Sequence, residues 1–183
     1  MPQFALTQGA RGSHALKDLC HPVLACAMSQ DIDAPNVVIH PPIALGMAIV
    51  IGFAANWVYP LPFTPPGIAH IELGLVVIAG AMLLVRWAVQ TFRRAKTNIL
   101  TNQATLAIVS TGPFAYSRNP IYVGALVGLI GFALVANSLW FLIALVPMFL
   151  VLEFGVIARE EAYLTRKFGQ PYLDYKSKVR RWL

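Results

Sequence analysis

The sequence is poor in charged residues and in cysteine. Charged side chains make up 12% of its 183 residues, whereas a soluble globular domain carries about 25%. This scarcity argues against an ordinary water-soluble domain. A hydrophobic fraction of 57% and a mean hydropathy of +0.64 instead indicate an integral membrane protein. The two cysteines, Cys20 and Cys26, imply no disulfide framework and are not spaced like zinc ligands, so we expect no metal site.

The few charges that are present are unevenly distributed. Before Arg86 there are two basic and four acidic residues, a net charge of −2, and from Arg86 onward there are twelve basic and four acidic residues, a net charge of +8. A basic half beside apolar helices normally faces the cytoplasm and its anionic lipids. The basic residues flank apolar helices rather than forming a soluble patch, so we expect a membrane and no nucleic acid as the partner.

Four apolar stretches predict an all-α membrane protein with about four transmembrane helices. The predicted spans are Ile43–Val58, Ile68–Val89, Pro120–Ala136 and Leu139–Ala158. Each is close to the roughly 17–25 residues that cross a bilayer. Asn137-Ser138 is a turn signal, so the last two spans form a tight hairpin. Small residues on the third span favour close helix packing, and they are Gly124, Gly128 and Gly131.

The segments outside the spans differ in character. Residues 1–36 are weakly patterned and predict an N-terminal extension, which leaves 37–183 as a single membrane domain. Residues 159–169 predict an amphipathic cytoplasmic helix that ends at Gly169, and the basic, aromatic tail 170–183 is suited to the membrane surface. Basic residues at the helix ends predict that both termini are cytoplasmic, as in a bacterial inner-membrane protein.

Two charged residues interrupt the apolar spans. Arg86 lies six residues before Phe92 and Glu153 six before Arg159, which places both about 9 Å inside the cytoplasmic ends of their helices. Charges inside a membrane are costly and are usually paired or functional. We therefore predict a buried Arg86–Glu153 pair, with snorkelling of Arg86 to the interface as the alternative.

The longest informative polar break runs from Thr111 to Tyr122. Gly112-Pro113 is a turn signal, and Asn119-Pro120 is typical of a helix start, with Asn at the N-cap and Pro at the first helical position. One interpretation is an interfacial connector. The other is a ligand site, because the free N–H groups of a helix N-terminus favour anions and acceptors, and the hairpin brings Glu160 to the same membrane level, where it suits a cationic ligand.

These segments together resemble the isoprenylcysteine carboxyl methyltransferase and phospholipid methyltransferase superfamily of small membrane enzymes. The resemblance covers about Leu106 to Leu183, nearly half of the chain. The matching residues are Gly112-Pro113-Phe114, Arg118-Asn119-Pro120-Ile121-Tyr122, Glu160-Glu161, Leu164, Phe168-Gly169, Tyr172, Tyr175 and Val179. No Gly-x-Gly-x-x-Gly motif follows a strand, so the sequence does not predict a Rossmann methyltransferase.

The resemblance implies that the chain binds S-adenosylmethionine at the cytoplasmic face, in a region spanning about 106–183, with the basic tail folded over the cofactor. By motif position it implies cofactor contacts from Leu106, Val109, Phe114, Arg118, Asn119, Pro120, Ile121, Tyr122 and Glu160. The reaction expected from it is transfer of a methyl group to a lipid-like or amphiphilic acceptor, an amine or a carboxylate, mainly by proximity and orientation. Glu161 or Glu160 would take the proton from an amine.

The chain also departs from the family pattern. The carboxyl methyltransferases usually have His where this chain has Asn119, and Asn-Pro-x-Tyr resembles the phospholipid N-methyltransferases. The prenylcysteine enzymes place a substrate-binding Arg where this chain has Val156; Arg159, three positions away, is the candidate for that role. The alternatives to a methyltransferase are a membrane NADPH-dependent reductase of similar architecture and a non-enzymatic membrane scaffold.

Overall fold

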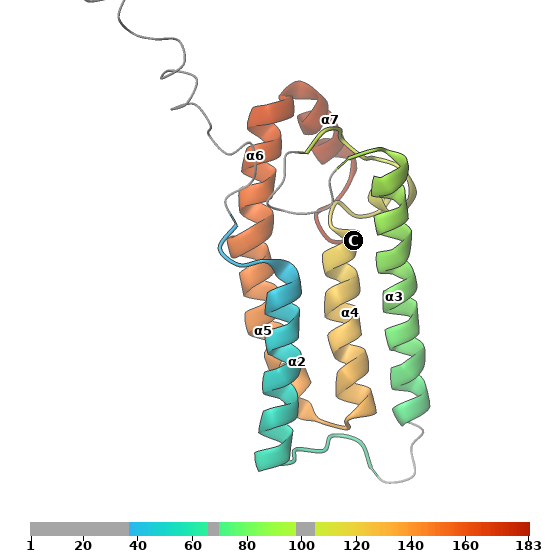
Figure 1. The fold of residues 1–183 in the computed structure, drawn as a ribbon, viewed down its shortest axis with the longest axis vertical. Helices are drawn as coiled ribbons and strands as arrows, with labels where there is room; N and C mark the ends of the chain where they lie inside the picture. The colour runs from blue at the N-terminus through green and yellow to red at the C-terminus, as the bar shows by residue number, and fades with distance from the viewer. Residues whose placement is uncertain (1–36, 66–69, 98–104) are drawn as a thin grey trace, which may run out of the picture. The chain divides into compact units, whose positions relative to one another are not determined.

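The computed structural model describes residues 37–65, 70–97 and 105–183, and within these ranges it is helical with no strand. The N-terminal extension expected at 1–36 lies outside the described residues. Figure 1 shows the elements, which in chain order are α2 (Pro41–Val58), α3 (His70–Arg94), the short 3₁₀ helix η1 (Gly112–Ala115), α4 (Pro120–Val135), α5 (Leu139–Leu150), the π-helical turn η2 (Val151–Ile157), α6 (Ala158–Phe168) and α7 (Gln170–Lys178).

Within the part of the chain that the structure describes, three helices are long and apolar enough to cross a membrane. They are Pro41–Val58, His70–Arg94 and the continuous helix Leu139–Phe168, while Pro120–Val135 is a shorter apolar helix. Large apolar side chains cover their outer faces, such as Val76 at 67% and Met82 at 62% exposure, as expected where the surrounding solvent is lipid. The chain is therefore an all-α integral membrane protein, as its sequence predicts.

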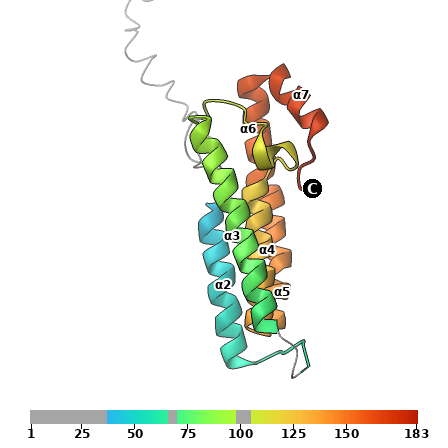
Figure 2. The ribbon, with the colours of Figure 1, turned by 90° about the vertical axis from the view of Figure 1, so that its right-hand side faces the viewer.

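Helix α4 lies between α3 and the pair α2 and α5 (Figures 1 and 2). Glycines allow α3 and α4 to approach closely. A Cβ atom added to Gly131 would lie 2.6 Å from Ile78 Cγ1, and one on Gly74 would lie 2.7 Å from the backbone nitrogen of Val135. Gly124 is equally constrained by Val85. The predicted packing role of the glycines is thus confirmed at Gly124 and Gly131.

The predicted hairpin turn between α4 and α5 is present and ties down the proline-rich connector after α2. Asn137 adopts a φ of +41°, and its side-chain oxygen accepts hydrogen bonds from the backbone N–H groups of Phe63 and Thr64 at 3.1 and 3.0 Å. The backbone N–H of Leu139 donates to the carbonyl of Leu61 at 2.9 Å. At this end of the bundle, hydrogen bonds therefore join the turn between α4 and α5 to the connector that follows α2.

The fourth span and the amphipathic helix that the sequence predicts after Ala158 are both present, and the structure joins them without interruption. Together they form one helix from Leu139 to Phe168, which ends at Gly169 with a φ of +58°, as its glycine predicts. The π-helical turn Val151–Ile157 lies within this helix, and such turns recur at functional sites. The carboxylates Glu160 and Glu161 thus stand on a rigid extension of a spanning helix.

The C-terminal segment folds back onto the loop before α4 (Figure 2), as the family resemblance implies for the basic tail. The backbone N–H of Arg118 donates to the carbonyl of Arg180 at 3.0 Å, and Asn119 Nδ2 donates to the carbonyl of Arg181 at 3.0 Å. Trp182 packs on Phe149 with ring centroids 5.1 Å apart. The basic tail thereby becomes part of the structure around the start of α4.

Candidate functional site

A cavity of about 260 Å³ lies at the end of the bundle where α6, α7, the start of α2 and the start of α4 meet. Its walls are largely apolar and aromatic, with an arginine and two carboxylates among them. The lining residues are His40, Pro41, Pro42, Phe92, Thr105, Ala107, Ile108, Val109, Phe114, Arg118, Asn119, Pro120, Ile121, Tyr122, Glu160, Glu161, Tyr163, Leu164, Tyr172 and Tyr175. Its volume is close to the lower end of the range for small-molecule sites, roughly 300 Å³.

A tyrosine–carboxylate pair joins α4 to α6 in the cavity wall. Tyr122 Oη donates a hydrogen bond of 2.8 Å to Glu160 Oε1. Tyr122 is in the first turn of α4, placed there by the Asn119-Pro120 helix start, and it is 8% exposed. Residues 38 positions apart in the sequence thus meet where the two helices converge. A carboxylate among apolar walls is a strong electrostatic feature, because few other groups there screen its charge.

The adjacent Glu161 has a different environment from that of Glu160. It forms ion pairs with Arg118 Nη1 at 2.8 Å, Lys176 Nζ at 3.1 Å and Arg181 Nη2 at 2.8 Å. Arg181 Nε also donates to it at 2.9 Å, so the Arg181–Glu161 contact is bidentate. With three cations around one carboxylate, Glu161 is a poor proton acceptor and holds α4, α6, α7 and the C-terminal segment together.

The predicted pairing of Arg86 with Glu153 is wrong. Glu153 Oε1 accepts a hydrogen bond from Arg181 Nη1, and its other oxygen accepts one from Trp182 Nε1 at 2.9 Å. Arg86 is exposed on α3, and α4 lies between α3 and the long helix that carries Glu153 (Figure 1). The helices that carry Arg86 and Glu153 therefore do not pack against each other.

Aromatic side chains form part of the cavity wall. Tyr175 Oη donates to the carbonyl of Phe114 at 2.8 Å, and Phe114 lies against Phe92 with ring centroids 4.5 Å apart. Burial, aided by neighbouring Tyr172, raises the pKa of Tyr175, and burial together with Glu161 raises the pKa of Tyr172. Both tyrosines are therefore neutral hydrogen-bonding groups at physiological pH.

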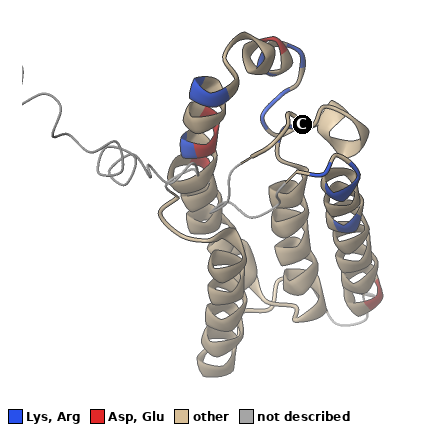
Figure 3. Cartoon of the chain, turned by 45° about the horizontal axis from the view of Figure 1, so that its top comes forward, with Lys and Arg blue, Asp and Glu red and all other residues tan. Residues whose placement is uncertain are grey.

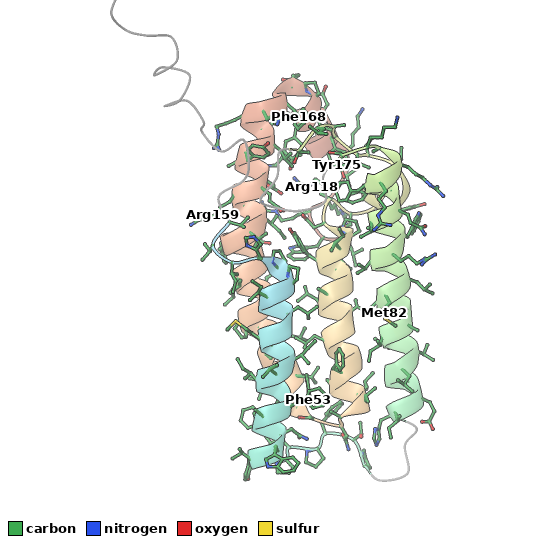
Figure 4. All side chains as sticks on the ribbon, in the orientation of Figure 1. Phe53, Met82, Arg118, Arg159, Phe168 and Tyr175 are labelled. Atoms are coloured by element: carbon green, nitrogen blue, oxygen red, sulfur yellow. The ribbon has the colours of Figure 1, made fainter. Side chains whose placement is uncertain are left out.

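Most of the residues singled out from the sequence line this one cavity. They are Val109, Phe114, Arg118, Asn119, Pro120, Ile121, Tyr122, Glu160 and Glu161. Two do not. Leu106 is 62% exposed, and only its neighbours Thr105 and Ala107 face the cavity. Arg159 is also exposed and lies on the opposite side of the long helix from Arg118 (Figure 4).

Several lining or supporting residues were missed by the sequence reasoning. His40, Pro41 and Pro42 bring the start of α2 into the lining, and Arg181 supports it through Glu161. The tyrosines of α7 match the family pattern, so the sequence did contain a signal that they belong to the site. Arg181 gave none, because its role arises only when the tail folds back.

Comparison with known proteins supports a family relationship. The profile described as phospholipid methyltransferase matches residues 69–171, more than half of the chain. That range contains α3, α4, the long helix and both members of the Tyr122–Glu160 pair. The chain is also similar to an uncharacterized protein of Haemophilus influenzae, with 44% identity over 64 residues, which are 34% of this chain and 100% of that protein.

Proposed function

Because the chain belongs to the phospholipid methyltransferase family, a family of membrane methyltransferases, we propose that it transfers a methyl group from S-adenosylmethionine to an amphiphilic acceptor. The observation that carries the proposal is the Tyr122–Glu160 hydrogen bond of 2.8 Å in the wall of a largely apolar cavity. The motif at the start of α4 and the acidic position of α6 contribute to one chamber, which is the arrangement that such a cofactor requires.

The residues present suit this cofactor. S-adenosylmethionine carries an ammonium and a sulfonium group, and Glu160 is a carboxylate beside aromatic rings that favour cations. Apolar side chains, including Ile108, Val109 and Leu164, offer packing for the adenine. When bound, the cofactor supplies an electrophilic methyl group. The protein then has to bind the two substrates, orient them and exclude water. Its side chains need to carry out little covalent chemistry.

The acceptor we propose is a lipid-like molecule whose polar group carries an amine or a carboxylate. The cavity is lined by the start of α2 and by Phe92 near the end of α3, so it lies at the level where an amphiphile has its headgroup. For an amine, Glu160 is the better proton acceptor, because Glu161 is held by Arg118, Lys176 and Arg181. Of the two carboxylates predicted as candidate bases, Glu160 is therefore the one that we propose.

We propose that the cavity lies at the cytoplasmic face of a bacterial inner membrane. Basic residues gather at this end of the molecule, on α6, on α7 and at the end of α3 (Figure 3), while Glu72 is in the first turn of α3 at the other end. Such an asymmetry favours the cytoplasmic side for the basic end. The start of α2 and the C-terminal residues share that end.

The test is methyl transfer by the purified protein in lipid nanodiscs. With methyl-labelled S-adenosylmethionine and a bacterial lipid extract, we expect label in an extractable lipid fraction, and Glu160→Gln should reduce the rate at least about tenfold. Glu72→Gln is the matched control, since it removes a carboxylate at the opposite end of the bundle, and it should leave the rate unchanged. Equal labelling by the wild type and Glu160→Gln, or no labelling together with reduction of a lipid by NADPH, would refute the proposal.

A further inference from the structure

The Arg118 side chain is a buried cation with hydrogen-bonding capacity left over. Its side chain is only 9% exposed, and it lines the cavity. Nη1 lies within ion-pair distance of Glu161 Oε1, at 2.8 Å, but neither Nη1 nor the buried Nε makes a hydrogen bond to the described residues. An unsatisfied donor of this kind is costly and calls for an explanation. The ligand of the cavity is the group best placed to supply the missing acceptor.

The surroundings of Arg118 favour an anion. It directly precedes Asn119, the N-cap of α4, whose side chain does not cap the helix and instead donates to the carbonyl of Arg181 at 3.0 Å. The N-terminus of α4 therefore adds its own partial positive charge on the same side of the cavity, where Pro120 and Ile121 are part of the lining.

The nearby carboxylates do not use up this positive charge. Glu161 is shared among Arg118, Lys176 and Arg181, and Glu160 accepts from Tyr122. The cavity thus has a negative side at Glu160 and a positive side at Arg118, the charge arrangement that complements a zwitterion.

We propose that Arg118 binds an oxyanion of the ligand, a carboxylate or a phosphate, through its guanidinium group. This inference rests on the proposed function, because that function identifies two molecules that could supply the oxyanion. One is the carboxylate of the methyl donor's amino-acid group, and the other is the phosphate of a phospholipid acceptor. A planar guanidinium presents several donors in a fixed fork and suits either group.

Two matched pairs of probes distinguish the sources by equilibrium binding. S-adenosylmethionine and its decarboxylated form differ only in the carboxylate, and a short-chain diacylglycerol phosphate and the corresponding diacylglycerol differ only in the phosphate. Arg118→Gln should weaken the binding of the oxyanion-bearing member of one pair by about 10- to 100-fold, and the binding of its partner by less than about twofold. Selective loss of affinity in the first pair identifies the donor carboxylate as the group that Arg118 binds. Selective loss of affinity in the second pair identifies the lipid phosphate.

Controls separate a folding defect from a binding role. Decarboxylated S-adenosylmethionine and diacylglycerol report an intact cavity in the variant, and Arg118→Lys keeps the charge but loses the fork, so it should fall between the wild type and Arg118→Gln. Arg94→Gln removes an exposed arginine from the same end and should change no affinity. Equal effects of Arg118→Gln and Arg118→Lys on both members of each pair, or no effect on any probe, would overturn the inference. Failure of the wild type to bind either adenosine probe counts against the proposed function, and the lipid pair then still decides the role of Arg118.

Discussion

Arg181 connects the C-terminal segment to the long helix, and its removal should destabilise the fold measurably. Its guanidinium donates two hydrogen bonds to Glu161, from Nε at 2.9 Å and Nη2 at 2.8 Å, and a third to Glu153. The side chain is 31% exposed, whereas those of Glu161 and Glu153 are 8% and 17% exposed. The contact is therefore partly buried, and the hydrogen bonds to Glu161 and Glu153 raise the pKa of Arg181, which stays charged at any pH of interest.

The expected loss of folding free energy follows from the contacts that remain in Arg181→Ala. Breaking a fully buried pair costs about 3–5 kcal/mol. Here Glu161 keeps Arg118 and Lys176, but Glu153 keeps only the hydrogen bond from Trp182 among the described contacts. Partial exposure and the remaining cations reduce the expected loss to about 2–3 kcal/mol. For a chain of this size, that corresponds to a fall in the thermal midpoint of about 5–10 °C.

The assay is thermal unfolding of the purified protein in one fixed detergent, with Arg180→Ala as the control. Arg180 is the adjacent arginine, and its side chain is exposed; its backbone carbonyl, not its guanidinium, contacts the loop. Arg181→Ala should therefore lower the midpoint far more than Arg180→Ala. Adding Glu153→Gln to Arg181→Ala should restore part of the loss, because the orphaned carboxylate is removed. Equal midpoints for the two arginine variants would refute the reasoning.

Three further predictions concern the packing, the cavity and the tyrosines. Gly74→Ala should lower the thermal midpoint, since its Cβ would lie 2.7 Å from the backbone nitrogen of Val135 and 2.8 Å from a carbonyl oxygen, whereas Gly80→Ala, with nothing within 4 Å, should leave it unchanged or raise it. Tyr122→Phe should weaken S-adenosylmethionine binding less than Glu160→Gln does, as measured by calorimetry, because it removes one hydrogen bond but no charge; the reverse order would contradict the assignment. Folding raises the pKa of Tyr175, so the stabilising contribution of this residue is complete below the unfolded pKa of about 10 and is lost as the pH rises above that value. The thermal midpoint should therefore fall above about pH 10, and it should fall less steeply in Tyr175→Phe.

The helices and their ends were predictable because their signals are local. Asn119-Pro120 marks the start of α4 and Gly169 the end of α6, and each acts through the backbone of its own neighbourhood. The continuity of the helix through Ala158 was not evident from the sequence, because a change from apolar to amphipathic composition is compatible both with two helices and with one uninterrupted helix.

The site was predictable in part. Tyr122 and Glu160 belong to a motif and meet as the hairpin requires. Arg159 does not line the cavity, because Glu160 and Glu161 face it and Arg159 is rotated by about 200° around the helix from Glu161. The partner of Glu153 was missed because Arg181 follows it by 28 residues, and only the return of the tail brings the two together. Contacts of that kind depend on the tertiary fold and leave no periodic trace in the sequence.

The most direct test of the central claim is calorimetric titration of the purified wild-type protein with S-adenosylhomocysteine, the product of the proposed donor, and separately with NADPH. We expect saturable binding of S-adenosylhomocysteine at one site per chain and no binding of NADPH. A folded sample that binds NADPH, or that binds neither molecule, would contradict the claim that Glu160, Tyr122 and the loop before α4 enclose a methyl-donor site.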